Sequence, residues 1–264
     1  MKGRMKPMKI VTWNLNSIRA RLQHVVDWVQ ENEPDVLCLQ ETKVRNEEFP
    51  LEVFQEMGLN VYFHGQPAYN GVAFITPHEL EDVKHGFPEG NMDEQARVIS
   101  ATLKGVRIIN VYAPQGESPE SPKFQFKTRF YARLIQWLRE DFNPEDKVLL
   151  CGDLNIAPEE IDVVDPVASA EKCMFLPEER QWFNDILDWG MEDSFRKFHK
   201  EAELYSWWDY RQFSFRRNKG LRIDHVLVTP SLLEKATESG IDKTPRGLER
   251  PSDHTPVYTV FDIS

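Results

Sequence analysis

The stretch KVLLCGDLNIAP, residues 147–158, joins a buried strand to polar residues at its end. Val148 to Gly152 and Leu154 are apolar or small, as expected of a strand buried on both faces. Asp153 and Asn155 are two residues apart, so their side chains share one side of the chain if it is extended. A carboxylate near a core costs free energy unless a partner compensates it. The stretch therefore predicts a polar site at the end of a central strand.

Further runs rich in Val, Ile, Thr, Tyr and Phe predict more strands. They lie at residues 9–16, 35–42, 71–77, 97–103, 106–114, 222–230 and 255–263. Apolar residues at helical spacing lie between several of them and predict helices. These helical segments lie around residues 22–29, ending before Pro34, around 130–138, and from Pro177 to Gly190.

Two of the strand runs, 97–103 and 106–114, follow each other directly, so the sheets are mixed rather than wholly parallel. We predict an α/β fold of two packed mixed sheets flanked by helices. We expect residues 8–264 to form a single domain and residues 1–7 to form a loose N-terminal leader.

Composition limits the location and the partners. The 264 residues are 41% hydrophobic, and no apolar run approaches the roughly 20 residues of a membrane span. The N-terminal residues lack the apolar stretch of a secretory signal. Cys38 and Cys151 lie inside strand runs, which predicts buried free thiols and a cytoplasmic protein. The net charge of −11 argues against a polyanionic partner, but residues 210–223 contain five basic residues and no acidic one.

A weak internal repeat involves the segments TWNLN (12–16) and CGDLN (151–155). Each ends a predicted strand with a polar residue, a leucine and an asparagine. The pairs Asn14–Asn16 and Asp153–Asn155 therefore predict two halves of one fold, each presenting polar groups at the same edge.

Other acidic groups occur at strand ends or inside strands: Glu41 after LCLQ, Asp224 in RIDHVLV, and Asp253 beside His254 in PSDHTPV. A carboxylate inside a strand requires a partner. The set is rich in oxygen and contains a single histidine, which suits Mg²⁺ or Mn²⁺ and does not suit zinc. With Asp and His to handle protons, this chemistry favours phosphoester hydrolysis.

Seven segments in order resemble the exonuclease III family of DNA-repair nucleases, within the endonuclease/exonuclease/phosphatase superfamily. They are TWNLNSIRARL, PDVLCLQETK, VYAPQGE, GDLNIAPEEIDV, SWWDYR, GLRIDHVLV and RPSDHTPV. The resemblance implies a four-layered α/β/β/α sandwich and a Mg²⁺-dependent phosphodiesterase. It implies double-stranded DNA as the substrate, cut 5′ to abasic sites or trimmed at 3′ ends and 3′-blocking groups.

The resemblance also implies residue roles. Glu41 resembles the principal metal ligand, Asp153 would orient or deprotonate the attacking water, and Asp224 would orient a cationic His254. The implied metal site comprises Asn14, Asn16, Glu41, Asp153, Asn155, Asp253 and His254. The implied catalytic residues are Tyr112, Asp153, Asn155, Asp224 and His254.

The implied DNA contacts are Gln115, Trp207, Arg211, Arg216, Arg217, Leu221, Arg222 and Ile223. Among these, Trp207, Leu221 and Ile223 would form the walls of an apolar pocket for a flipped-out abasic sugar. The basic residues and Gln115 would hold DNA phosphates. We expect Trp208 and the remaining tryptophans in the core.

Two alternatives stay open beside this interpretation. One is a superfamily phosphodiesterase with another substrate: a nonspecific DNase, an inositol phosphatase or a sphingomyelinase-like enzyme. The other is a catalytically silent scaffold. The segments SWWDYR and GLRID favour DNA repair over the first, and the competent residue at every matched position opposes the second. Segment 163–175 matches the family poorly, and nothing in the sequence requires more than a monomer.

Overall fold

The structure is a computed structural model that describes residues 6–88 and 95–263. Residues 1–5 of the expected leader lie outside the described residues. The strands are β1 (Met8–Asn14), β2 (Val36–Gln40), β3 (Asn60–His64), β4 (Val72–Thr76), β5 (Glu81–His85), β6 (Val98–Leu103), β7 (Val106–Tyr112), β8 (Val148–Asp153), β9 (Glu192–Asp193), β10 (Asp224–Val228), β11 (Ala236–Ile241) and β12 (Val257–Phe261). The α-helices are α1 (Ile18–Asn32), α2 (Leu51–Glu56), α3 (Pro122–Asp141), α4 (Pro166–Ser169), α5 (Pro177–Trp189), α6 (Ser194–Phe198) and α7 (Pro230–Leu233).

The strands form two six-stranded mixed sheets, in the orders β11-β12-β1-β2-β4-β3 and β9-β10-β8-β7-β6-β5. In each sheet one central pair is parallel, β1 with β2 and β7 with β8. The strands on either side of that pair run antiparallel. The two sheets therefore share one pattern of directions, with β1 and β8 at equivalent places. The repeat in the sequence reflects a repeat in the fold.

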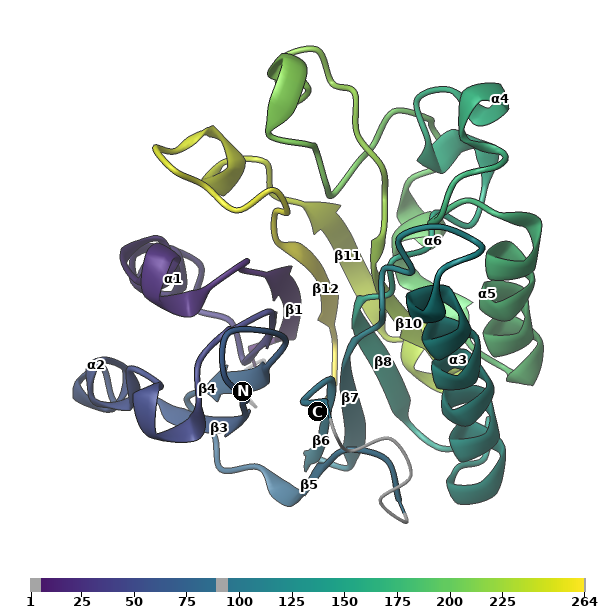
Figure 1. Cartoon of the computed structure of the whole chain (residues 1–264). Coiled ribbons are helices and arrows are strands. Elements are labelled where there is room, and N and C mark those ends of the chain that lie inside the picture. Colours follow the sequence, from purple (N-terminus) through teal and green to yellow (C-terminus); the bar gives the residue numbers. More distant parts are fainter. Residues whose placement is uncertain (1–5, 89–94, 264) are drawn as a thin grey trace.

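The layers follow from three apolar clusters. One cluster, including Cys38, Phe74 and Ile108, lies between the two sheets. A second joins α1 and α2 to the outer face of the first sheet, and a third joins α3 and α5 to the outer face of the second. Figure 1 shows the resulting sandwich, with α1 and α2 on the left and α3 and α5 on the right. This confirms the predicted α/β/β/α architecture.

The tryptophans mostly lie where the sequence predicts. Trp13, Trp28, Trp137 and Trp208 are buried, whereas Trp182 and Trp189 are only partly buried against the cluster beneath α5. All three cysteines are free and buried. Within the described residues, no helix is both long and apolar enough to cross a membrane.

Gly152 in β8 allows the two central strands of the second sheet to approach closely. Its φ is 141°, and a Cβ atom placed there would lie 1.9 Å from the carbonyl oxygen of Val111 in β7. Only glycine tolerates both the conformation and the approach. The next residue is Asp153, so this contact places the carboxylate at the end of the sheet.

Candidate active site

The two polar pairs end their strands with the same turn. Asn16 and Asn155 have φ values of 49° and 51°, so neither continues an extended strand. The amide of Asn16 donates to Asn14 Oδ1 at 2.9 Å, and the amide of Asn155 donates to Asp153 Oδ1 at 3.0 Å. The chain is therefore not extended through these pairs, and the condition for a shared side is not met. In each pair, the side-chain oxygen of the first residue accepts a hydrogen bond from the backbone amide of the second, and this bond holds the turn.

The ends of the two sheets meet through Asn14. Its Nδ2 donates to Glu41 Oε1 at 2.9 Å and to Asp153 Oδ2 at 2.8 Å. Glu41 follows β2 in the first sheet, and Asp153 ends β8 in the second. Asn14 and Asp153 are 139 positions apart in the chain, yet they form one polar cluster at the adjoining strand ends.

His254 joins this cluster from the loop before β12. Its Nδ1 bonds to Asp224 Oδ2 at 2.9 Å, and its Nε2 lies 3.6 Å from Asp153 Oδ2. Burial alone would lower the pKa of His254, but the charges of Asp224 and Asp153 outweigh it and raise that pKa to about 10. The imidazole is therefore a cation at neutral pH. A cationic ring has no free lone pair for a metal, which favours the predicted phosphate-binding role over the predicted ligand role.

Asp224 has the partners that its burial requires. The hydroxyl of Ser206 donates to its Oδ2 at 2.6 Å, and His254 bonds to the same atom. Sequence reasoning missed Ser206, although it is the first residue of the quoted SWWDYR segment. The three side chains form a chain of hydrogen bonds that sets the orientation of the ring.

Asp153 is a carboxylate able to change its protonation state. Burial raises its pKa to about 7, against the lowering effect of the His254 charge and the hydrogen bond from Asn14. A group with this pKa can accept a proton near neutral pH.

A second set of contacts surrounds Glu41. The Lys43 ammonium lies 2.7 Å from Glu41 Oε2 and donates to Asn16 Oδ1 at 2.6 Å. Asn16 Nδ2 donates in turn to Asp253 Oδ1 at 3.0 Å. Sequence reasoning missed Lys43, which ends the quoted PDVLCLQETK segment. Glu41 and Asn16 thus hold the Lys43 ammonium between them, and Asn16 links this pair to Asp253.

Tyr112 ends β7 beside the cluster. Burial, followed by the charges of Glu41 and Asp153, raises its pKa well above the usual range, so the phenol is neutral. The guanidinium of Arg97, which sequence reasoning missed, lies 4.7 Å from the centre of the Tyr112 ring. A neutral phenol held in this way can donate a hydrogen bond to an anion.

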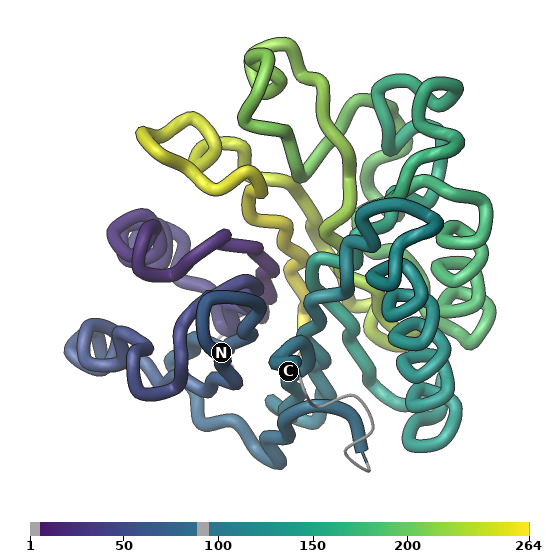
Figure 2. Tube along the Cα trace, viewed as in Figure 1, coloured from purple at the N-terminus to yellow at the C-terminus, as the bar shows by residue number. Residues whose placement is uncertain are grey.

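A cavity of about 810 Å³ contains four of the predicted DNA contacts. Its lining includes Gln115, Trp207, Arg211 and Leu221, together with part of the 164–175 segment. Ile223 does not line it and instead packs below, in a small apolar cluster with Trp207 and Leu221. Figure 2 shows the segments around residues 165–175 and 210–220 on the same side of the molecule.

Arg222 corrects one prediction. It is 1% exposed, and its guanidinium bonds to Asp162 and Asp193 and contacts Nδ1 of His225. A side chain held by the carboxylates of Asp162 and Asp193 cannot reach DNA phosphates, so Arg222 is structural. Its neighbours in the basic stretch, Arg216 and Arg217, are exposed as predicted.

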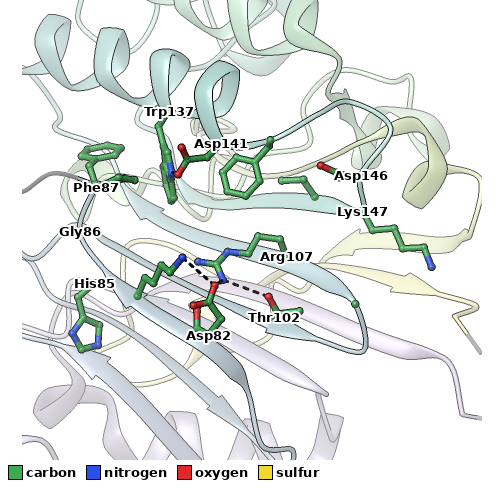
Figure 3. A pocket seen from close by; sticks show the side chains of 15 residues that line it. Asp82, His85, Gly86, Phe87, Thr102, Arg107, Trp137, Asp141, Asp146 and Lys147 are labelled. Carbon is green, nitrogen blue, oxygen red and sulfur yellow. Dashed lines mark hydrogen bonds and ion pairs between the residues drawn. The ribbon is translucent and has the colours of Figure 1, made fainter.

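A second cavity, of about 850 Å³, lies at the opposite ends of β7 and β8. Its lining includes Arg107, the second residue of β7, and Val148, the first residue of β8. Figure 3 shows the ion pair between Arg107 and Asp82 in its wall. At roughly 3.3 Å per strand residue, the length of β8 separates this cavity from Asp153. It has no part in the cluster described above.

Comparisons with known proteins agree with this geometry. The model of the endonuclease/exonuclease/phosphatase family matches residues 11–254. Exodeoxyribonuclease III of Haemophilus influenzae is 41% identical, covering 96% of this chain and 100% of its own. Among solved structures, a Neisseria 3′ phosphatase bound to a product DNA hairpin superposes with a TM-score of 0.94 and 44% identity. An AP endonuclease from Archaeoglobus fulgidus superposes with a TM-score of 0.94 and 40% identity. Each alignment to these structures covers 97% of this chain and 100% of the other.

Proposed function

The chain belongs to the endonuclease/exonuclease/phosphatase family, and we propose that it is a Mg²⁺-dependent DNA-repair phosphodiesterase of the exonuclease III type. It hydrolyses the bond 5′ to an abasic site and removes 3′ nucleotides and 3′-blocking groups. The observation that carries the proposal is the single polar cluster in which Glu41, Asp153 and His254 come together from both sheets.

The oxygen donors of this cluster fit a hard divalent cation. A carboxylate oxygen of Glu41 and one of Asp153 lie within 4.8 Å of each other. The Lys43 ammonium already lies between Glu41 and Asn16, which supports the view that these oxygens favour a cation. Glu41 and Asp153, with Asn14, Asn16, Asn155 and Asp253 close by, would hold Mg²⁺, for which Mn²⁺ is a chemically similar substitute. When bound, the ion would neutralise charge on the scissile phosphate and on the departing 3′ oxygen.

The protein's own groups supply the remaining chemistry. Asp153 orients a water molecule and accepts its proton as the water oxygen forms a bond to phosphorus. The cationic His254, oriented by Asp224, donates to a phosphate oxygen and stabilises the charge that develops there. The phosphorus–O3′ bond then breaks, and the 3′ oxygen takes a proton from solvent water. Asn155 and Tyr112 would also donate hydrogen bonds to the phosphate.

The cavity beside the cluster fits the proposed substrate. Trp207 and Leu221 offer apolar walls to a sugar that lacks its base, while Gln115 and Arg211 in the same lining would offer polar groups to the DNA backbone. The exposed Arg216 and Arg217 extend this basic surface. Such local charge explains how a chain of net charge −11 binds a polyanion.

We further propose that residues 8–264 act as one catalytic domain and that the protein works as a cytoplasmic monomer. Glu41, Asp153 and His254 meet within one chain, so this cluster needs no residue from a second copy. Analytical ultracentrifugation with and without duplex DNA tests this point, and a dimer as the active species would overturn it.

The function is tested by a time course on three duplexes: one with an internal abasic site, one with a 3′-phosphate, and one undamaged. We expect Mg²⁺-dependent incision or 3′ trimming of the first two, and complete loss in EDTA. Faster turnover of the undamaged duplex, of an inositol phosphate or of sphingomyelin would favour another substrate class. No hydrolysis of any of them would favour a silent scaffold.

A further inference from the structure

Two charged side chains are completely buried between helices α3 and α5, away from the reacting groups. Lys127 lies in the first half of α3, and Glu179 lies in the first turn of α5. Neither side chain has any exposed surface, and the two form an ion pair. Figure 1 shows α3 and α5 side by side on the outer face of the second sheet. Fully buried lysines and glutamates are rare unless they are paired.

The Lys127 ammonium has three hydrogens, and each has an acceptor. One goes to Glu179 Oε1, one to the carbonyl oxygen of Asn155 at 2.8 Å, and one to the carbonyl oxygen of Gln115 at 3.2 Å. The other carboxylate oxygen of Glu179 accepts the amide of Leu176 at the start of α5. One cation thus joins two helices to two loops.

Both loops belong to the proposed site. Gln115 lines the cavity beside Trp207. Asn155 follows Asp153, and its left-handed turn is held on three sides. Its amide donates to Asp153, its Nδ2 donates to the carbonyl of Ala113 at 2.9 Å, and its carbonyl accepts from Lys127.

A buried ion pair is a poor way to gain stability. Removing two charges from water costs about as much as their attraction returns, and a well-packed apolar pair is often equally stable. An apolar pair here would leave the two loop carbonyls without a donor. The charged pair therefore has a consequence that packing cannot replace: it holds the backbone of Asn155 and Gln115 in place.

We propose that Lys127 and Glu179 are a positioning pair that sets the active-site geometry through the carbonyls of Asn155 and Gln115. The pair touches neither substrate nor metal and acts only through these two loops. Its effect on catalysis rests on the proposed function, whereas its effect on the loops does not. We expect loss of the pair to lower kcat more than it raises KM, because Asn155 contacts the reacting phosphate and Gln115 contacts the backbone beside it.

The test uses the double variant Lys127→Met/Glu179→Gln in the full chain. It removes both charges, so no unpaired ion stays buried, and the glutamine keeps the oxygen that caps α5. The single variant Lys127→Met would leave the carboxylate alone in the core and strongly destabilise the fold, which would confuse a structural effect with a positioning effect. The control is Arg107→Met/Asp82→Asn, which removes an ion pair from the far end of β7.

Two measurements decide the question. Hydrogen exchange is followed in peptides covering residues 113–118 and 153–158, with β1 as the reference. Incision of an abasic duplex gives kcat and KM. We expect faster exchange in the two loops only, a fall in kcat of about 10²-fold, and a thermal midpoint within about 10 °C of the wild type. The control variant should change neither the hydrogen exchange of the two loops nor kcat.

A third measurement separates positioning from general weakening. Asn155→Ala is made in the wild type and in the double variant. If the pair acts through Asn155, the second substitution costs much less in the double variant than in the wild type. The inference would be overturned by any of three results. These are additive losses of kcat on combining Asn155→Ala with the double variant, an unchanged kcat in the double variant, or unchanged hydrogen exchange in its two loops. If the wild type cuts no DNA, the proposed function fails, and hydrogen exchange alone still decides whether the pair positions the loops.

Discussion

Replacing Asp224 with asparagine isolates the charge that holds His254 in its cationic form. The substitution keeps the shape of a fully buried side chain and removes only the negative charge. In the wild type, Asp224 bonds to His254 Nδ1 and is the first of the groups that raise the ring's pKa to about 10. In the Asp224→Asn variant the side-chain amide would form only a neutral hydrogen bond, so the ring no longer has a charged partner at Nδ1.

The size of the effect follows from the lost charge. An opposite charge in contact is worth about 1–3 pKa units, so the pKa of His254 should fall to between roughly 7 and 9. This corresponds to about 1.4–4 kcal/mol less stabilisation of the cation. Activity needs the protonated His254 ring. Activity is therefore lost as the pH rises through the lowered pKa of His254. With a pKa between roughly 7 and 9, we expect incision by Asp224→Asn, relative to the wild type at the same pH, to fall by up to about 10-fold at pH 8 and to recover at pH 6.

The assay is single-turnover incision of an abasic duplex from pH 6 to pH 9.5. Ser206→Ala is the matched control, because it removes a hydrogen bond to the same carboxylate and leaves the charge in place. The incision rate of Ser206→Ala should begin to fall at the same alkaline pH as that of the wild type. Parallel profiles for wild type and Asp224→Asn would refute the reasoning, because the charge on Asp224 would then have no influence on the reactive ring.

Three further predictions concern binding and stability. Arg216→Ala should weaken duplex binding at all sequences and reduce the slope of log K against log salt by about 1; an unchanged slope in fluorescence anisotropy would remove Arg216 from the interface. Burial lowers the pKa of His225 to about 4, from an ordinary 6.5, so the folded state should lose about 2 kcal/mol between pH 7 and pH 5 as the unfolded chain takes up the proton. Measured by urea unfolding, the change in stability from pH 7 to pH 5 should be about 2 kcal/mol less favourable in the wild type than in His225→Gln, because the other titrating groups are common to both proteins; equal changes would contradict it. Gly152→Ala should destabilise the protein by about 3–5 kcal/mol, because its Cβ would meet the carbonyl of Val111; a urea midpoint equal to that of the wild type would contradict the close approach of β7 and β8.

The strands that sequence patterns missed have one property in common. The eight predicted runs each contain a strand, whereas β3, β5, β9 and β11 escaped notice. These four are the edge strands of the two sheets. An edge strand has solvent on one side and often carries charge to prevent pairing with other chains. β5, with the sequence EDVKH, is mostly exposed and has no apolar run to reveal it.

In the candidate site, too, some features could be predicted from sequence patterns and others depend on contacts that only the folded structure shows. Motif segments identified the residues that meet in the cluster, because polar groups at strand ends are visible in sequence. The turn at Asn155 was not visible, since its left-handed φ depends on a hydrogen bond from its own amide to Asp153. Arg222 was misread because a basic stretch does not reveal which of its members turns inward to buried carboxylates.

Lys127 was missed for a related reason. In the sequence it belongs to a basic segment of α3 and looks like a surface residue. Its partner Glu179 lies 52 positions away, and nothing local indicates that the two meet. Only the packing of α3 against α5 brings them together.

The central claim is that Glu41 and Asp153, from different sheets, act on one phosphate. Single-turnover incision of an abasic duplex by Asp153→Asn and Glu41→Ala, with saturating Mg²⁺ and with folding checked by circular dichroism, tests it most directly. We predict that both variants fold and that each loses at least about 10³-fold in rate. Full activity in either variant would contradict the claim, because the cluster could not then be the place where the phosphodiester bond is cut.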